Sequence, residues 1–70
     1  MRQCVVVGLG IFGAAVARTL VEKGCEVLAI DEDEEKVKEI SNIVTQAVQA
    51  DATDEKTLRS LGVDKMDMAI

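Results

Sequence analysis

The chain has 70 residues, of which 49% are apolar, and its 13 acidic and 8 basic residues give a net charge of −5. This length fits one small domain, near the size at which a single hydrophobic core is only just sufficient. The apolar content excludes a disordered segment. The acidic balance, with the basic residues scattered along the chain, argues against duplex nucleic acid or an anionic membrane surface as the main partner.

No stretch of the sequence is predicted to enter a membrane or to direct secretion. Glycines interrupt the longest apolar run, and Arg18 follows it short of a membrane span. No charged, apolar and small-residue cleavage pattern opens the chain. We therefore expect a cytoplasmic protein with no direct membrane insertion.

The first predicted strand, over residues 3–7, is followed by three glycines at G-x-G-x-x-G spacing, namely Gly8, Gly10 and Gly13. In a dinucleotide-binding fingerprint the first glycine makes a sharp turn. The second lets the backbone approach a pyrophosphate, and the third lets the helix pack against the strand. The phosphate would lie on unpaired N–H groups at the start of the next helix.

That helix is predicted to run from Phe12 to a stop at Gly24. Phe12 is the only aromatic residue of the chain, and we expect it to pack beneath the glycine loop. The charged residues Arg18, Glu22 and Lys23 are expected to face water. The residues expected to face the sheet are small or aliphatic, namely Ala14, Ala15, Val16, Leu20 and Val21.

A second strand, over residues 26–30, ends at Asp31, at the distance from the glycines where dinucleotide-binding proteins carry the acid that binds a ribose. Its carboxylate would accept hydrogen bonds from both ribose hydroxyls and would repel a 2′-phosphate. The next residues are acidic, with no arginine among them, so NADP is disfavoured. The acidic run 32–35 also fits a solvated helix start with Asp33 as its cap.

The rest of the chain predicts two more helices and two more strands. A helix over residues 34–41 would bury Val37 and Ile40, with either Ile43 or Val44 beside them. A short alternating strand over residues 46–50 fits the edge of a sheet. A third helix is expected to be capped by Thr53 and ended by Gly62, with leucines inward, and a fourth strand to begin within residues 67–70.

This order of elements predicts an α/β fold, a Rossmann-like parallel sheet with right-handed crossovers and strand order 3-2-1-4. We expect a truncated structure, half of a doubly wound domain, in which the fourth strand is an exposed edge. Such an edge tends to pair with another copy or with a missing segment.

The sequence contains no obvious catalytic or metal-binding residues. It has no histidine and no tyrosine, and no serine or cysteine stands in a pattern that pairs it with a base. Cys4 and Cys25 are too far apart for a C-x-x-C motif and fit buried apolar positions. A P-loop is missing from the sequence. We therefore predict no enzyme activity, no catalytic residue and no metal site.

Three segments resemble the KTN or RCK nucleotide-binding domains, the TrkA-type regulatory subunits of potassium uptake systems and channels. They are the glycine loop over residues 8–13, the strand end at Asp31 with Glu35-Lys36-Val37 after it, and the turn over residues 50–54 with Leu58 and residues 61–63 after it. The resemblance spans nearly the whole chain. It implies that residues 1–70 form the N-terminal part of such a domain.

The resemblance also implies a cofactor site built from the glycine loop, the ribose acid and the third-strand turn. Residues 51–53 would border the adenine, although Asp51 equally fits a turn in which an aspartate binds its own backbone. The implied ligand is NAD(H) or an adenine nucleotide (ATP, ADP or AMP). Many ATP-responding members have a basic residue in the loop, where this chain has Leu9 or Ile11. The implied site residues are Gly8, Gly10, Ile11, Phe12, Gly13, Asp31, Glu32, Asp51, Ala52 and Thr53.

The function implied is that of a regulatory module. Nucleotide binding would change how subunits pack in a homodimer or larger ring. That movement would gate a potassium channel or transporter, with this chain peripheral to the inner face of the cell membrane. Two alternatives stay open: the cofactor-binding half of an NAD-dependent dehydrogenase, since this scaffold hosts both roles, and a half-Rossmann fragment that self-associates.

Overall fold

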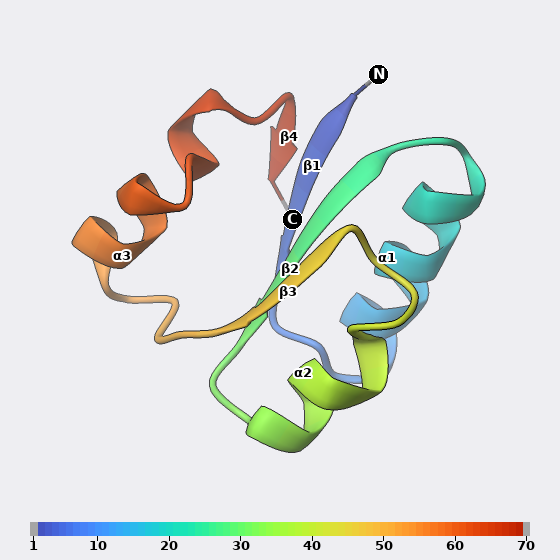
Figure 1. Cartoon of the computed structure of the whole chain (residues 1–70), viewed down its shortest axis with the longest axis horizontal. Coiled ribbons are helices and arrows are strands. Elements are labelled where there is room, and N and C mark those ends of the chain that lie inside the picture. Colours follow the sequence, from blue (N-terminus) through green and yellow to red (C-terminus); the bar gives the residue numbers. More distant parts are fainter. Residues whose placement is uncertain (1, 70) are drawn as a thin grey trace.

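The computed structural model describes residues 2–69 and shows helices alternating with the strands of one parallel sheet (Figure 1). The sheet order is β3-β2-β1-β4, as the sequence predicts. The fourth strand is expected to continue to residue 70, which lies outside the described residues. The elements are β1 (Gln3–Val7), α1 (Ile11–Glu22), β2 (Glu26–Asp31), α2 (Glu34–Ile40), β3 (Gln46–Gln49), α3 (Glu55–Ser60), the 3₁₀ helix η1 (Val63–Lys65) and β4 (Met68–Ala69).

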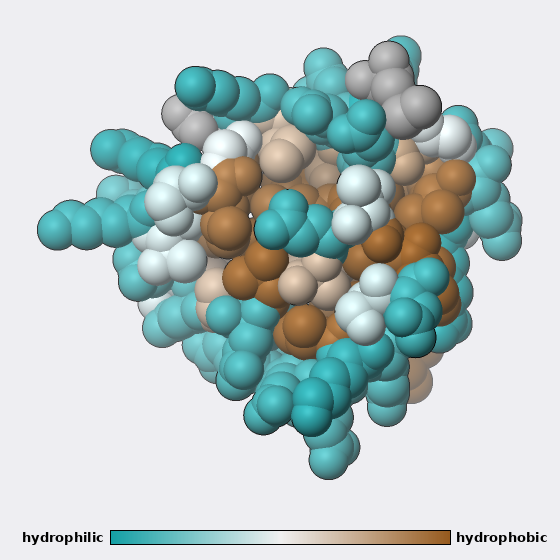
Figure 2. All heavy atoms as spheres, in the orientation of Figure 1, coloured by the Kyte–Doolittle hydropathy of each residue, from teal (hydrophilic) through white to brown (hydrophobic). Residues whose placement is uncertain are grey.

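Helices cover the two faces of the sheet in separate groups, with α1 and α2 on one face and α3 on the other (Figure 1). Val6 and Val27 point into the core beneath α1 and α2, and the alternate residues Val5 and Leu28 point toward α3 and η1. Both central strands are therefore buried on two sides, which explains their continuous apolar sequence. On the face shown in Figure 2, apolar side chains gather between the two helix groups and hydrophilic ones surround them.

The inner face of α1 differs from the predicted one at two positions. Ala17 is completely buried, whereas Ala15 is exposed. Phe12 does not pack beneath the glycine loop, because its side chain is 77% exposed. Successive residues of an α-helix are 100° apart, and the side of α1 that faces the sheet contains Gly13 and Ala17. Phe12 and Ala15 are therefore directed away from the sheet.

The helix ends are set by two aspartates and two glycines. Asp33 caps α2 as predicted, because its side chain accepts a hydrogen bond from the Glu35 amide. Helix α3 is capped by Asp54 and not by Thr53, since the extended backbone of Asp54 lets its side chain accept from the amide three residues later. Gly24 and Gly62 follow α1 and α3 with φ values of 88° and 81°, conformations that favour glycine.

In the segment after α2, Val44 and not Ile43 is buried beside Ile40. Ile40 is 2% exposed and Val44 is 7% exposed, whereas Ile43 between them is 37% exposed. The amides of residues 43 and 44 both donate to the carbonyl of Ile40, and this turn directs Val44 back under the sheet. Ile40 thus closes the core between α2 and β2.

Truncation of Ile40 should therefore weaken the fold far more than truncation of Ile43. We expect Ile40→Ala to cost about 2–5 kcal/mol because it leaves a cavity, which is a large part of the total stability of a small domain. Ile43→Ala should cost less than about 1 kcal/mol, as surface substitutions do. Urea unfolding followed by circular dichroism measures both, and equal losses would contradict this packing.

Candidate functional site

The carboxyl ends of three strands meet at one edge of the sheet, and backbone hydrogen bonds hold them together. The Gly8 amide donates to the Ile30 carbonyl at 2.8 Å, which joins the glycine loop to the end of β2. The Ala50 amide donates to the Asp31 carbonyl at 3.1 Å, which joins the end of β3 to the same place. In open α/β sheets, ligands bind outside this edge.

Each glycine of the loop has a distinct structural role. Gly8 has a φ of 92° and turns the chain sharply out of β1. A methyl group on Gly13 would overlap the Gly8 carbonyl oxygen, so only glycine lets α1 start this close to the strand. A methyl group on Gly10 would meet no atom within 4 Å, and the backbone there is open to a ligand.

The start of α1 is left without a cap among the described residues. Gly10 occupies the cap position and provides no side-chain hydrogen bond, and the first turn contains no acidic residue. The first N–H groups of a helix have no partner inside the helix. The positive end of α1 is therefore open to an anionic group.

Asp31 fastens the end of β2 to the glycine loop. One carboxylate oxygen accepts from the Leu9 amide at 2.6 Å, and the other accepts from the Asp33 amide at 2.8 Å. The backbone amides of Asp33 and Leu9 hold the pKa of the Asp31 carboxyl below its usual value. The side chain is thus ionised near neutral pH, and each oxygen keeps acceptor capacity for a ligand hydroxyl.

A hollow of about 350 Å³ opens beside this carboxylate. Four predicted site residues line it, namely Gly8, Asp31, Glu32 and Ala52. Three lining residues were not predicted as site residues, namely Val7, Ile30 and Ala50. In the sequence they resemble ordinary residues of a strand or a strand end. The hollow therefore combines an apolar wall with two carboxylates.

The other predicted site residues lie outside this hollow. The Asp51 side chain accepts from the Thr53 amide at 2.8 Å and from its hydroxyl at 2.7 Å. These bonds lower the pKa of the Asp51 carboxyl. They match the expectation of a turn in which Asp51 accepts hydrogen bonds from nearby residues. Ile11 is 96% exposed at the start of α1. It lines a second hollow with Gly10, between α1 and α2, where Arg18 and Lys36 are the basic residues.

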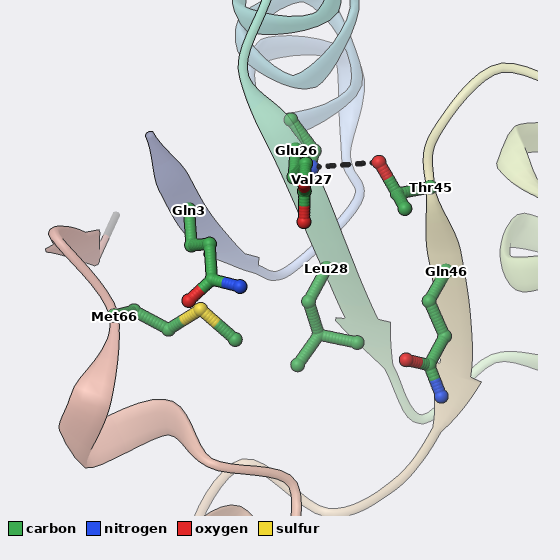
Figure 3. Close-up of a pocket in the computed structure, with 7 residues that line it drawn as sticks. All are labelled: Gln3, Glu26, Val27, Leu28, Thr45, Gln46 and Met66. Atoms are coloured by element: carbon green, nitrogen blue, oxygen red, sulfur yellow. Dashed lines mark hydrogen bonds between the residues drawn. The ribbon is translucent and has the colours of Figure 1, made fainter. Parts of the chain in front are cut away.

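A third hollow lies at the opposite end of the strands, as Figure 3 shows. Thr45 lies at its rim, where its hydroxyl accepts a hydrogen bond from the Val27 amide at 3.1 Å. Its volume is about 100 Å³, and it is lined by Gln3, Glu26, Val27, Leu28, Thr45, Gln46 and Met66. It is separate from the glycine loop and from Asp31.

Three further observations concern a cysteine thiol, metal ligands and membrane spans. Burial raises the pKa of the Cys4 thiol, which keeps it protonated and poorly nucleophilic. No group of three or more potential metal ligands occurs among the side chains that the structure describes. Within the same part of the chain, no helix has the length and apolar character needed to cross a membrane.

The parallel sheet, the glycine turn and the acid at the end of β2 define a Rossmann-like α/β unit. Residues 4–70 match the TrkA-N domain, and the chain belongs to this family. The predicted resemblance is thereby confirmed.

The relatives are named as potassium uptake proteins. The chain is 44% identical over 69 residues to Ktr system potassium uptake protein C of Bacillus subtilis (strain 168) and to Ktr system potassium uptake protein A of Vibrio alginolyticus. Each match covers 99% of this chain and 31% of the relative. It is 36% identical over 64 residues to a Trk system potassium uptake protein TrkA homolog of Pyrococcus abyssi, which covers 90% of this chain and 28% of that relative. The chain thus spans about a third of the length of these curated relatives.

Two of the three glycines of the loop, Gly13 and Gly10, provide a matched test of its geometry. Gly13→Ala should destabilise the fold by about 1–3 kcal/mol or more, because the new methyl group overlaps backbone. Gly10→Ala should leave stability unchanged or slightly higher, because its φ is −65° and the space is open. Thermal unfolding of both variants measures the difference. A Gly10→Ala loss as large as that of Gly13→Ala would contradict the described packing.

Proposed function

We propose that this chain is a non-catalytic nucleotide-binding module that regulates potassium transport through a membrane partner. The observation that carries the proposal is the ionised Asp31 carboxylate, held by the Leu9 amide at the mouth of the hollow beside the glycine turn. Asp31 offers acceptors for a ribose, and the start of α1 after Gly10 offers open N–H groups for phosphate at the same edge of the sheet.

The ligand would lie across the carboxyl edge of the sheet. Its ribose hydroxyls would donate to Asp31, and its adenine would rest on the apolar wall of the hollow next to Ala52. Its phosphate groups would extend past Gly10 toward the start of α1, where the space beside the backbone is open. In this proposal the chain's own residues bind and orient the nucleotide and take part in no proton transfer.

The charges around the hollow narrow the class of ligand. Its charged lining residues are Asp31 and Glu32, both acidic. A second phosphate on the ribose would lie against these carboxylates and be repelled. This supports NAD(H), ATP, ADP or AMP over NADP.

The regulatory part of the proposal rests on the family of the chain and on thermodynamic linkage between nucleotide binding and subunit packing. The relatives named above are potassium uptake proteins, and we extend that role to this chain. A nucleotide shifts an assembly only as far as it binds one arrangement of subunits more tightly than the other. We therefore propose that binding at Asp31 biases the packing of subunits on the cytoplasmic side of a potassium-translocating membrane protein.

Isothermal titration calorimetry with NADH, NAD, ATP, ADP and AMP tests the binding step. We expect at least one of them to bind, and Asp31→Asn to weaken that binding by about tenfold or more, as loss of charge-assisted hydrogen bonds does. Because the pKa of the Asp31 carboxyl is lowered, the carboxylate stays ionised to a lower pH than an ordinary aspartate side chain does. Affinity should therefore hold from about pH 5 to 8 and fall only in more acidic solution.

The matched control is Glu35→Gln, which removes one charge from the same acidic run. Glu35 is exposed and lines none of the three hollows described above. Its substitution should leave the affinity within about twofold. Equal losses in the two variants would show a general charge effect, and binding by none of the five nucleotides would refute the proposed site.

A further inference from the structure

The two cysteines of the chain are distant in the sequence but lie close together in the fold. Cys4 belongs to β1, and Cys25 is the residue just before β2. In the parallel register Cys4 pairs with Val27, two residues after Cys25. The Glu26 amide donates to the Arg2 carbonyl at 2.8 Å, which holds the two chain segments together at this end of the sheet. The crossover through α1 thus returns Cys25 to the neighbourhood of Cys4.

Both cysteine side chains lie on the face of the sheet that α1 and α2 cover. Side chains alternate along a strand, so Cys4 shares the face of Val6, which belongs to the core beneath these helices. Cys25 packs against the same core. Its amide donates to the Leu20 carbonyl at 3.0 Å, so the turn after α1 fixes its position.

The two thiols differ in their access to solvent. Cys4 is 0% exposed, whereas Cys25 is partly exposed. Burial, and then a hydrogen bond with the Cys25 thiol, raise the pKa of the Cys4 thiol. Because Cys4 is buried and protonated, a small oxidant in solution meets Cys25 first. Cys4 then lies behind it, within reach of its sulfur atom.

We propose that Cys4 and Cys25 form a redox-sensitive pair, which hydrogen peroxide oxidises to a reversible disulfide. Cys25 reacts with the oxidant, and Cys4 resolves the product. The pair lies where β1 and β2 begin, at the end of the strands opposite the glycine loop and Asp31 (Figure 1). This role is therefore separate from nucleotide binding and can be tested without a nucleotide.

The reaction balances in two steps. The Cys25 sulfur loses its proton and attacks one oxygen of the peroxide, the O–O bond breaks, and one water leaves a sulfenic acid on Cys25. The Cys4 sulfur then attacks the Cys25 sulfur, the S–O bond breaks, and the Cys4 proton leaves with the hydroxyl group as a second water. Two thiols lose two electrons in total, and one peroxide gains them. A dithiol reductant restores both thiols by exchange.

The disulfide fastens the turn after α1 to the start of β1. It closes a loop through the whole of α1, which restricts the unfolded chain. We expect the oxidised chain to unfold about 10 °C or more above the reduced chain. Thermal unfolding followed by circular dichroism measures the shift. A midpoint that is unchanged or lower in the oxidised chain overturns the proposal, because the bond would then not fit the native sheet.

Peptide mapping of the 70-residue chain tests the pairing directly. The reduced chain is treated with one equivalent of hydrogen peroxide at low protein concentration, and the remaining thiols are alkylated. We expect the tryptic peptides 3–18 and 24–36 to be joined, and dithiothreitol to restore both thiols. A disulfide between two chains, or a treated chain with both thiols still free, overturns the proposal.

Two variants separate the roles of the cysteines, with dimedone as the reagent that traps a sulfenic acid. Cys4→Ala leaves Cys25 without its resolving partner, so dimedone labelling should rise by about tenfold or more over the unchanged chain. Cys25→Ser leaves only the buried thiol, which should react with peroxide at least about tenfold more slowly. Equal dimedone labelling with and without Cys4 overturns the proposal. If Cys4→Ala does not fold, the peptide map and the rate for Cys25→Ser still decide.

Discussion

The hydrogen bond from the Leu9 amide to the Asp31 carboxylate is the interaction on which this structure depends most. It joins the loop after β1 to the end of β2. Together with the bond from the Asp33 amide, which has the larger effect, it lowers the pKa of the Asp31 carboxyl and keeps it ionised at the edge of the sheet. The contact of Gly13 with the Gly8 carbonyl then fixes where α1 begins. A ribose acceptor and an open helix start thus lie at the same edge of the sheet, the first beside the hollow at Asp31 and the second beside the hollow between α1 and α2.

Much of the fold was predictable from sequence, because strong local signals agree with it. The glycine spacing, the buried strands and the order β3-β2-β1-β4 all follow from the pattern.

The wrong predictions concern the direction of side chains on α1 and the capping residue of α3, where a shift of one residue changes the outcome. Phe12 is expected from the sequence to pack beneath the glycine loop, yet α1 turns it outward. Asp54 and not Thr53 caps α3, since backbone conformation decides between neighbouring polar residues. The apolar wall of the hollow carried no sequence signal, because its residues resemble ordinary core.

A titration of isotope-labelled chain with NADH or AMP, followed by amide chemical shifts, tests the central claim most directly. If the carboxyl edge is the nucleotide site, the largest changes will fall on Gly8, Leu9, Asp31 and Ala52. The hollow at the amino ends of the strands, where Thr45 lies, will stay unchanged. Changes centred on that opposite hollow, or no changes with either nucleotide, would contradict the account.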